Sequence, residues 1–170
     1  MATFATSSGN RRNILLPGML DRVLGAGSAL MLAAIVAALA RGYPHWVEAK
    51  ATVWAHLVTI MIALALTPFL LLQRRGTARH RQIGYVWAAA MFATAAISLF
   101  IHESGPGWFS PIHLLSALTI VGVPAMIATA RKHRHAAHRF IVHSTVIGAL
   151  LIAGFFTFPF GRMLGHWLLG

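Results

Sequence analysis

The chain consists of long uncharged apolar runs separated by short segments in which its charged residues gather. A helix needs roughly 20 apolar residues to cross a hydrocarbon core of about 30 Å at 1.5 Å per residue. Five runs meet that length, and the pattern therefore predicts an all-α membrane protein built as a five-transmembrane-helix bundle. The predicted spans are residues 23–40, 51–72, 83–101, 111–130 and 140–158.

Local signals mark the ends of these runs and define one domain. Ser110–Pro111 is a favourable N-cap followed by proline at the first helical position, so it opens the fourth span. Pro159 and Gly161 close the fifth. We expect a cytoplasmic N-terminal tail over residues 1–22 and a single transmembrane domain over residues 23–170.

Composition strengthens the membrane assignment and excludes several functions. The chain of 170 residues is 58% hydrophobic and has only three acidic residues, Asp21, Glu48 and Glu103, too few for a soluble surface. Because these acids lie at the ends of spans, a hydrolase or a proton-coupled transporter is disfavoured. With no cysteine, disulfides and thiolate chemistry are excluded.

The distribution of Lys and Arg predicts the orientation. Eleven of the 14 basic residues lie in the N-terminal tail and in the second-to-third and fourth-to-fifth connections, whereas Arg41, Lys50 and Arg162 lie on the opposite side. Positive residues favour the cytoplasmic side, which predicts a cytoplasmic N-terminus and a periplasmic C-terminus in a bacterial inner membrane. The net charge of +11 is better explained by this topology and by anionic lipid headgroups than by nucleic acid.

Two features of the first span leave its role open. In one alternative, residues 1–40 form a cleaved signal peptide, with Arg11–Arg12 as a faint twin-arginine motif. The apolar run is long for such a peptide and begins far from the arginines. The span also has a face of small residues at which a helix of this chain, a homo-oligomer or a larger membrane complex could pack: Gly25, Ala29, Ala33 and Ala37.

Ten histidines in so apolar a chain are its most unusual feature. Four of them lie in predicted connections or in the tail, where we expect them to be solvated: His45, His133, His135 and His166. The spacing His133-x-His135-x-x-His138 could bind a metal, but no carboxylate or thiolate supports it.

The remaining histidines of interest form an outer pair and an inner pair, each at one depth in the membrane, with two candidates for one position of the inner pair. His56 and His113 lie one turn inside the outer ends of spans two and four, while His80 lies at the inner end of span three with His138 and the deeper His143 in span five. Histidines within spans normally face the bundle interior, where they bond across helices or ligate a cofactor such as haem. Since His138 and His143 lie about 140° apart on a helix, one site cannot use both equally.

The chain resembles a prokaryotic membrane family known as domain of unknown function 2306. The resemblance covers about residues 50–165 and rests on three segments: His80-Arg81-Gln82-Ile83-Gly84-Tyr85-Val86, Phe109-Ser110-Pro111-Ile112-His113-Leu114-Leu115-Ser116, and His138-Arg139 with Gly148 and Pro159-Phe160-Gly161-Arg162. Phe160 interrupts the usual ending, and Val142 replaces a frequent Met. This family implies a membrane bundle and no established activity.

In layout the chain also resembles cytochrome b-561 proteins, which ligate two haems with histidines on helices two with four and three with five. This resemblance implies His56 with His113 as the outer ligands, and His80 with His138 or His143 as the inner ligands. Gly84, one turn after His80, would leave room for a flat macrocycle. The two levels would lie roughly 20 Å apart, which suits electron transfer across the bilayer.

We therefore expect a protein that binds one or two b-type haems and transfers electrons, with quinone as a candidate partner. Arg162 is a candidate for pairing with a haem propionate, although it could simply anchor the helix at the headgroups. The alternative is a cofactor-free accessory subunit of a respiratory or photosynthetic complex. Metal transport is a weaker hypothesis, because the seven methionines are scattered.

Overall fold

Helices form all the regular secondary structure that the computed structural model describes, which covers residues 16–101, 111–159 and 161–170, and no strand occurs in those ranges. Four helical segments are long and apolar enough to cross a membrane: Met19–Arg41, Ala51–Leu72, His113–Arg131 and His135–Phe155. The predicted helical fold is confirmed, and four of its helical segments have the length and apolar composition of membrane spans. Glu103 lies outside the described residues.

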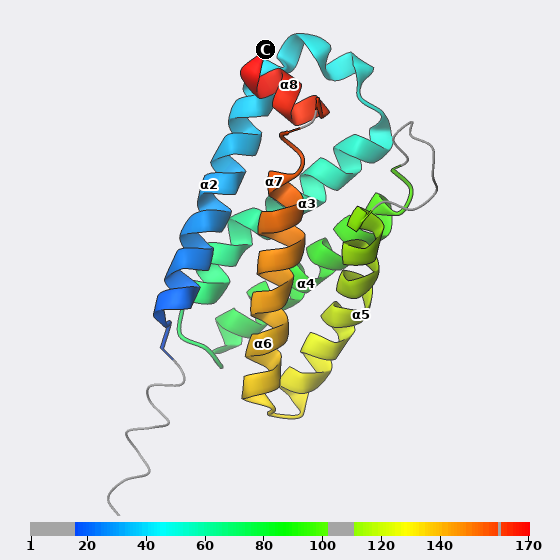
Figure 1. Ribbon diagram of the computed structural model, residues 1–170. Coiled ribbons are helices and arrows are strands. Elements are labelled where there is room, and N and C mark those ends of the chain that lie inside the picture. Colours follow the sequence, from blue (N-terminus) through cyan, green and yellow to red (C-terminus); the bar gives the residue numbers. More distant parts are fainter. Residues whose placement is uncertain (1–15, 102–110, 160) are drawn as a thin grey trace, which may run out of the picture.

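The helices pack in the order of the chain and close into a bundle (Figure 1). Helix α2 (Met19–Arg41) packs on α3 (Ala51–Leu72), α3 on α4 (Ala78–Ser98), and α4 on α5 (Pro111–Arg131). The fifth helix begins as α6 (His135–Thr145) against α5, and its continuation also contacts α2 and α3. We call the end where α2, α4 and α6 begin the basic end, since it carries the Arg-rich connections.

Helix α4 has 21 residues but is not among the four apolar segments. Its first turn is polar, with the sequence Arg79-His80-Arg81-Gln82, which lowers its mean hydropathy. The helix begins five residues before the predicted span because Thr77 caps it, accepting a hydrogen bond from the backbone N–H of His80 at 3.1 Å. His80 is therefore held in the first helical turn.

Helix α2 begins four residues earlier than the predicted span, at Met19. The Asp21 carboxylate accepts a hydrogen bond of 2.7 Å from the backbone N–H of Gly18, satisfying one of the donors at the helix start. Asp21 and Arg22, which the sequence places in the tail, thus belong to the first turn of the helix. Gly25 packs on α3, close to Pro68 and Leu72.

The fifth helix changes its winding near its middle. Residues Val146–Ile152 form a π-helical segment (η2), followed by the short α7 (Ala153–Phe155). Segments of this type are frequent near functional sites because they change which side chains face inward. Val146 and Leu150 of this segment are fully buried in the core, together with Leu64 and Met91.

Two short helices cover the end opposite the basic end. They are the 3-10 helix η1 (Tyr43–Glu48) and α8 (Met163–Leu169), which packs against α2 (Figure 1). Helix α8 is held at two points where only glycine fits. A Cβ on Gly42 would lie 2.3 Å from the Trp167 ring, and one on Gly165 would lie 1.6 Å from the Phe158 carbonyl oxygen.

A candidate cofactor site at the basic end

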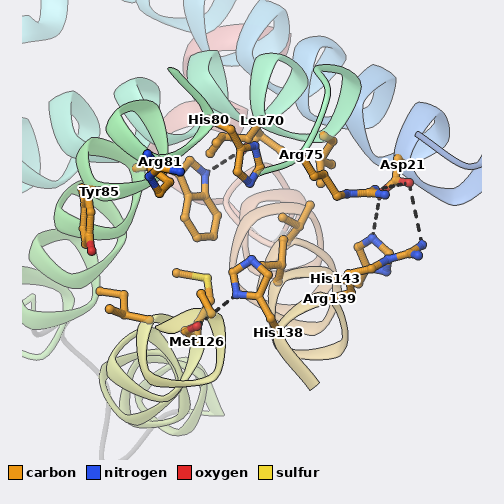
Figure 2. A pocket seen from close by; sticks show the side chains of 18 of the residues that line it. Asp21, Leu70, Arg75, His80, Arg81, Tyr85, Met126, His138, Arg139 and His143 are labelled. Atoms are coloured by element: carbon orange, nitrogen blue, oxygen red, sulfur yellow. Dashed lines mark hydrogen bonds and ion pairs between the residues drawn. The ribbon is translucent and has the colours of Figure 1, made fainter. Parts of the chain in front are cut away.

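A cavity of about 280 Å³ opens at the basic end between α3, α4, α5 and α6. Apolar side chains line most of it, and its polar lining is almost entirely cationic or histidine. Figure 2 shows these side chains gathered from helices far apart in the sequence. The titratable lining residues are Asp21, Arg75, His80, Arg81, Tyr85, Arg131, His133, His138, Arg139 and His143.

His138 is oriented by a hydrogen bond to the neighbouring helix. Its Nδ1 lies 3.0 Å from the backbone carbonyl oxygen of Met126 on α5. Because a carbonyl can only accept, Nδ1 carries the proton, and in the neutral ring the lone pair is on Nε2. This contact between Nδ1–H and a backbone carbonyl typically orients a histidine that ligates a metal through Nε2.

His80 lines the cavity from α4, and Figure 2 shows its ring directed toward that of His138. Its Nδ1 is buried and has no hydrogen-bond partner among the described residues. Buried polar atoms are nearly always bonded, so such an atom calls for an explanation, and an absent ligand is one. Both His80 and His138 line this cavity, one from α4 and the other from α6.

His143 has a different role, because it is paired with a carboxylate. Its Nε2 lies 2.8 Å from Oδ1 of Asp21, to which it donates, since an ionised carboxylate can only accept. Oδ2 of Asp21 pairs with Arg75 at 2.5 Å, and Arg139 lies 4.0 Å away. In the neutral ring of His143 the lone pair is therefore on Nδ1, whereas in His138 it is on Nε2.

Sequence reasoning missed the cluster that Asp21 organises. The Asp21 side chain has no exposed surface, and its partners come from the connection after α3 and from α6. Asp21 looked like a boundary charge because it precedes the first apolar run by two residues. Two features of the sequence could have indicated a buried ion pair at Asp21. Acids are scarce in this chain, and an acid so close to a membrane span needs a basic partner.

The residues around the cavity fit a flat, anionic cofactor. Gly84 lines it, and a Cβ built on Gly84 would meet only Leu70, at 3.9 Å, so the helix surface there is bare. In the part of the chain that the structure describes, no three His, Asp or Glu side chains form a group that could hold a metal ion. A haem iron needs only two axial ligands, and His80 and His138 both line this cavity.

The two histidines of the predicted outer pair lie on different helices, His56 on α3 and His113 on α5. Nδ1 of His56 donates to the backbone carbonyl of Thr94 on α4 at 3.2 Å, and Thr94 donates to Thr59 at 2.8 Å. His113 is half-buried on α5, one turn before Ser116, whose hydroxyl bonds to Ser98 at 2.5 Å. Neither histidine lines the cavity at the basic end.

The other predicted residues lie away from this cavity, with one exception. Arg162 precedes α8 at the end opposite the basic end, and His45 there pairs with Glu48 at 3.0 Å on the surface. His133 lines the cavity, and its ring packs edge-on against His135 with centroids 6.1 Å apart. The run from His133 to His138 is thus divided between the surface and the cavity wall.

Comparisons with protein-family models, curated proteins and solved structures found no match to this chain. The likeness to domain of unknown function 2306 and to the cytochrome b-561 layout therefore rests on the residues quoted above.

Proposed function

We propose that the protein is a b-type haem-binding membrane protein that transfers electrons, with a haem held in the cavity at the basic end by His80 and His138. The main support for this proposal is that His80 and His138 line the same cavity. Two histidines on different helices point into one cavity, one with Nδ1 bonded to a carbonyl and the other with a buried nitrogen lacking a partner among the described residues. Haem bound there would supply a one-electron carrier.

The choice of His138 over His143 follows from their hydrogen bonds. His143 donates Nε2–H to Asp21, and freeing that nitrogen would leave a buried carboxylate with one partner fewer. His138 makes its bond through Nδ1 and keeps Nε2 for a ligand. The Asp21 cluster would then position α6, and with it His138, against the rest of the bundle.

The charges of the cavity favour a ligand with carboxylates. Among the residues that the structure describes, Asp21 is the only acid that lines the cavity, and it is already paired with Arg75. Arg81 and Arg131 line the same cavity without contacting Asp21 in any described ion pair. Arg81 is better placed than Arg162 to bind a haem propionate at the basic end, because Arg162 lies beside α8 and Arg131 is directed to Tyr85.

We infer that all five helices cross the bilayer, with the basic end in the cytoplasm. Large apolar side chains are exposed along the bundle, such as Leu30 at 72%, Val121 at 71% and Phe140 at 73%, and lipid would cover them. Helix α4 lies between α3 and α5 in the packing order and is as long as its neighbours. Packing of α2 on α3 supports its presence in the mature bundle.

Electron transfer across the whole bilayer needs a second centre, for which His56 and His113 remain the candidates. The bond from Nδ1 of His56 to the Thr94 carbonyl leaves Nε2 as the free nitrogen, as in His138. Quinone is the candidate redox partner within the membrane. A single haem at the basic end would instead restrict electron transfer to the cytoplasmic half.

The test is an absorption spectrum of protein purified in detergent from cells well supplied with haem, oxidised and then reduced with dithionite. We expect a Soret band and a sharp α-band on reduction, with one or two haems per chain. Protein that is folded and monodisperse but featureless in the visible region, and that stays so after titration with haemin, would exclude the proposal.

The second candidate, a cofactor-free accessory subunit, is favoured by one specific observation. Three of the four small residues predicted to form a smooth face on the first span are exposed, namely Ala29, Ala33 and Ala37, while Gly25 is buried against α3. A face of this kind lets another helix approach closely. Colourless protein that migrates with a larger complex on native gels, and loses that migration on Ala33→Leu, would support this candidate instead.

A further inference from the structure

An open groove of about 680 Å³ runs along the seam between α4 and α5 on the outside of the bundle. Small side chains on both helices hollow it out, among them Ala88 and Ala89 on α4 and Ala128 on α5. At the basic end its lining finishes with Arg131 and Lys132. Apart from these two cations and Tyr85, every lining residue is apolar.

We propose that this groove is a specific site for one anionic phospholipid, whose phosphate binds at Arg131 and Lys132 and whose acyl chain lies along the alanines. The apolar floor runs from Tyr85 to Phe92 on α4, a rise of about 10 Å, which suits the upper part of an acyl chain. The groove shares Tyr85 and Arg131 with the wall of the cavity, but Lys132, Ala89 and Ala128 line the groove alone, so variants at these three positions test lipid binding separately from haem binding.

Charge complementarity identifies the ligand class. None of the described residues that line the groove is acidic, so its two cations face no carboxylate from that part of the chain. Asp21, the acid described at this end, is buried and paired with Arg75. A phosphodiester supplies the negative charge that the site lacks, whereas an uncharged quinone or a zwitterionic lipid supplies no net charge.

The geometry of Arg131 supports a built site rather than a general surface charge. Its Nη2 lies 3.3 Å from the hydroxyl of Tyr85, and its guanidinium carbon lies 6.0 Å from the centre of that ring. These contacts hold the guanidinium across the seam of the two helices, at the end of the groove. Only some of the five N–H donors of arginine face Tyr85, and the others can bind phosphate oxygens.

The experiment is native mass spectrometry of the detergent-purified full chain, titrated with phosphatidylglycerol or with phosphatidylcholine of the same acyl chains. We expect one phosphatidylglycerol to bind at least about tenfold more tightly than phosphatidylcholine. Lys132→Gln should weaken that preference several-fold. Arg134→Gln is the matched control, because it removes an exposed cation two residues away that does not line the groove, and it should have little effect.

A second pair of variants tests the acyl-chain part of the site. Ala128→Phe would fill the groove and should abolish the tightly bound lipid, whereas Ala33→Phe, at an exposed position on α2, should not. Both positions are exposed, so folding should survive and can be checked by circular dichroism. Equal losses in Lys132→Gln and Arg134→Gln, equal affinity for the two lipids, or displacement of phosphatidylglycerol by an uncharged quinone would overturn the proposal.

Discussion

Replacing Asp21 by asparagine is the substitution whose effect the structure predicts most sharply. Asp21→Asn keeps the shape of the side chain and an oxygen that can accept from Gly18, but it removes the charge that faces Arg75 and His143. The Asp21 side chain is fully buried and that of Arg75 is only 14% exposed. The substitution would therefore leave a largely buried guanidinium without its counter-charge.

Removing one partner of a buried ion pair costs about 3–5 kcal/mol. The contact with Arg139 is 4.0 Å long and that side chain is 37% exposed, so it adds no more than about 1 kcal/mol. Because the asparagine amide preserves part of the hydrogen bonding, we expect the lower end of the range. The predicted loss in free energy of unfolding is about 3 kcal/mol.

The assay is equilibrium unfolding in mixed micelles with increasing dodecyl sulfate, followed by the fluorescence of buried tryptophans such as Trp87. Glu48→Gln is the matched control, since the Glu48 side chain is 74% exposed beside His45 and should contribute little. A loss for Asp21→Asn that is below about 1 kcal/mol, or no larger than that of the control, would refute the idea that this cluster joins α2 to the fifth helix.

Three further predictions follow from exposed positions and from glycines. Because the chain has no cysteine, single cysteines introduced at Val47 and Ala136 can report the topology in intact cells. A membrane-impermeant thiol reagent should label Val47→Cys, which is at a position 96% exposed, and should not label Ala136→Cys. The reverse labelling pattern would mean that the orientation is inverted. Gly165→Ala should lower the free energy of unfolding by about 1–3 kcal/mol, since its Cβ would overlap the Phe158 carbonyl, and an unchanged unfolding curve would contradict this. Gly84→Ala should change the free energy of unfolding by less than about 0.5 kcal/mol. Gly84→Leu should lower the haem content, and full haem content in that variant would mean that the macrocycle binds elsewhere.

The ends of a helix could be predicted from the sequence where charged residues bound an uninterrupted apolar run. The helix at residues 51–72 has the predicted ends because charged residues bound an uninterrupted apolar run. The start of α2 was missed because Asp21 and Arg22 look solvent-facing until their partners are known, and those partners are distant in sequence. Helix α8 was not predicted, since a seven-residue helix held by close glycine contacts has too little periodicity to detect.

The candidate site could be predicted only in part. Helix geometry indicated that His138 and His143 face different directions, and the positions of His80 and His138 at one level follow from the span boundaries. Which of His138 and His143 keeps Nε2 free depends on contacts with Met126 and Asp21, which lie on other helices. No local pattern carries that information. The prediction that Arg162 pairs with a haem propionate rested on charge alone; the structure places Arg162 beside α8, whereas Arg81 lines the cavity at the basic end.

Haem ligation by His80 and His138 is tested most directly by the haem content of three single variants, measured per folded chain under identical expression. The variants are His80→Ala, His138→Ala and His143→Ala. We predict that His80→Ala and His138→Ala lose the haem at the basic end, whereas His143→Ala keeps it and loses only stability through the Asp21 cluster. Full haem content in His138→Ala together with its loss in His143→Ala would contradict the proposed ligand pair.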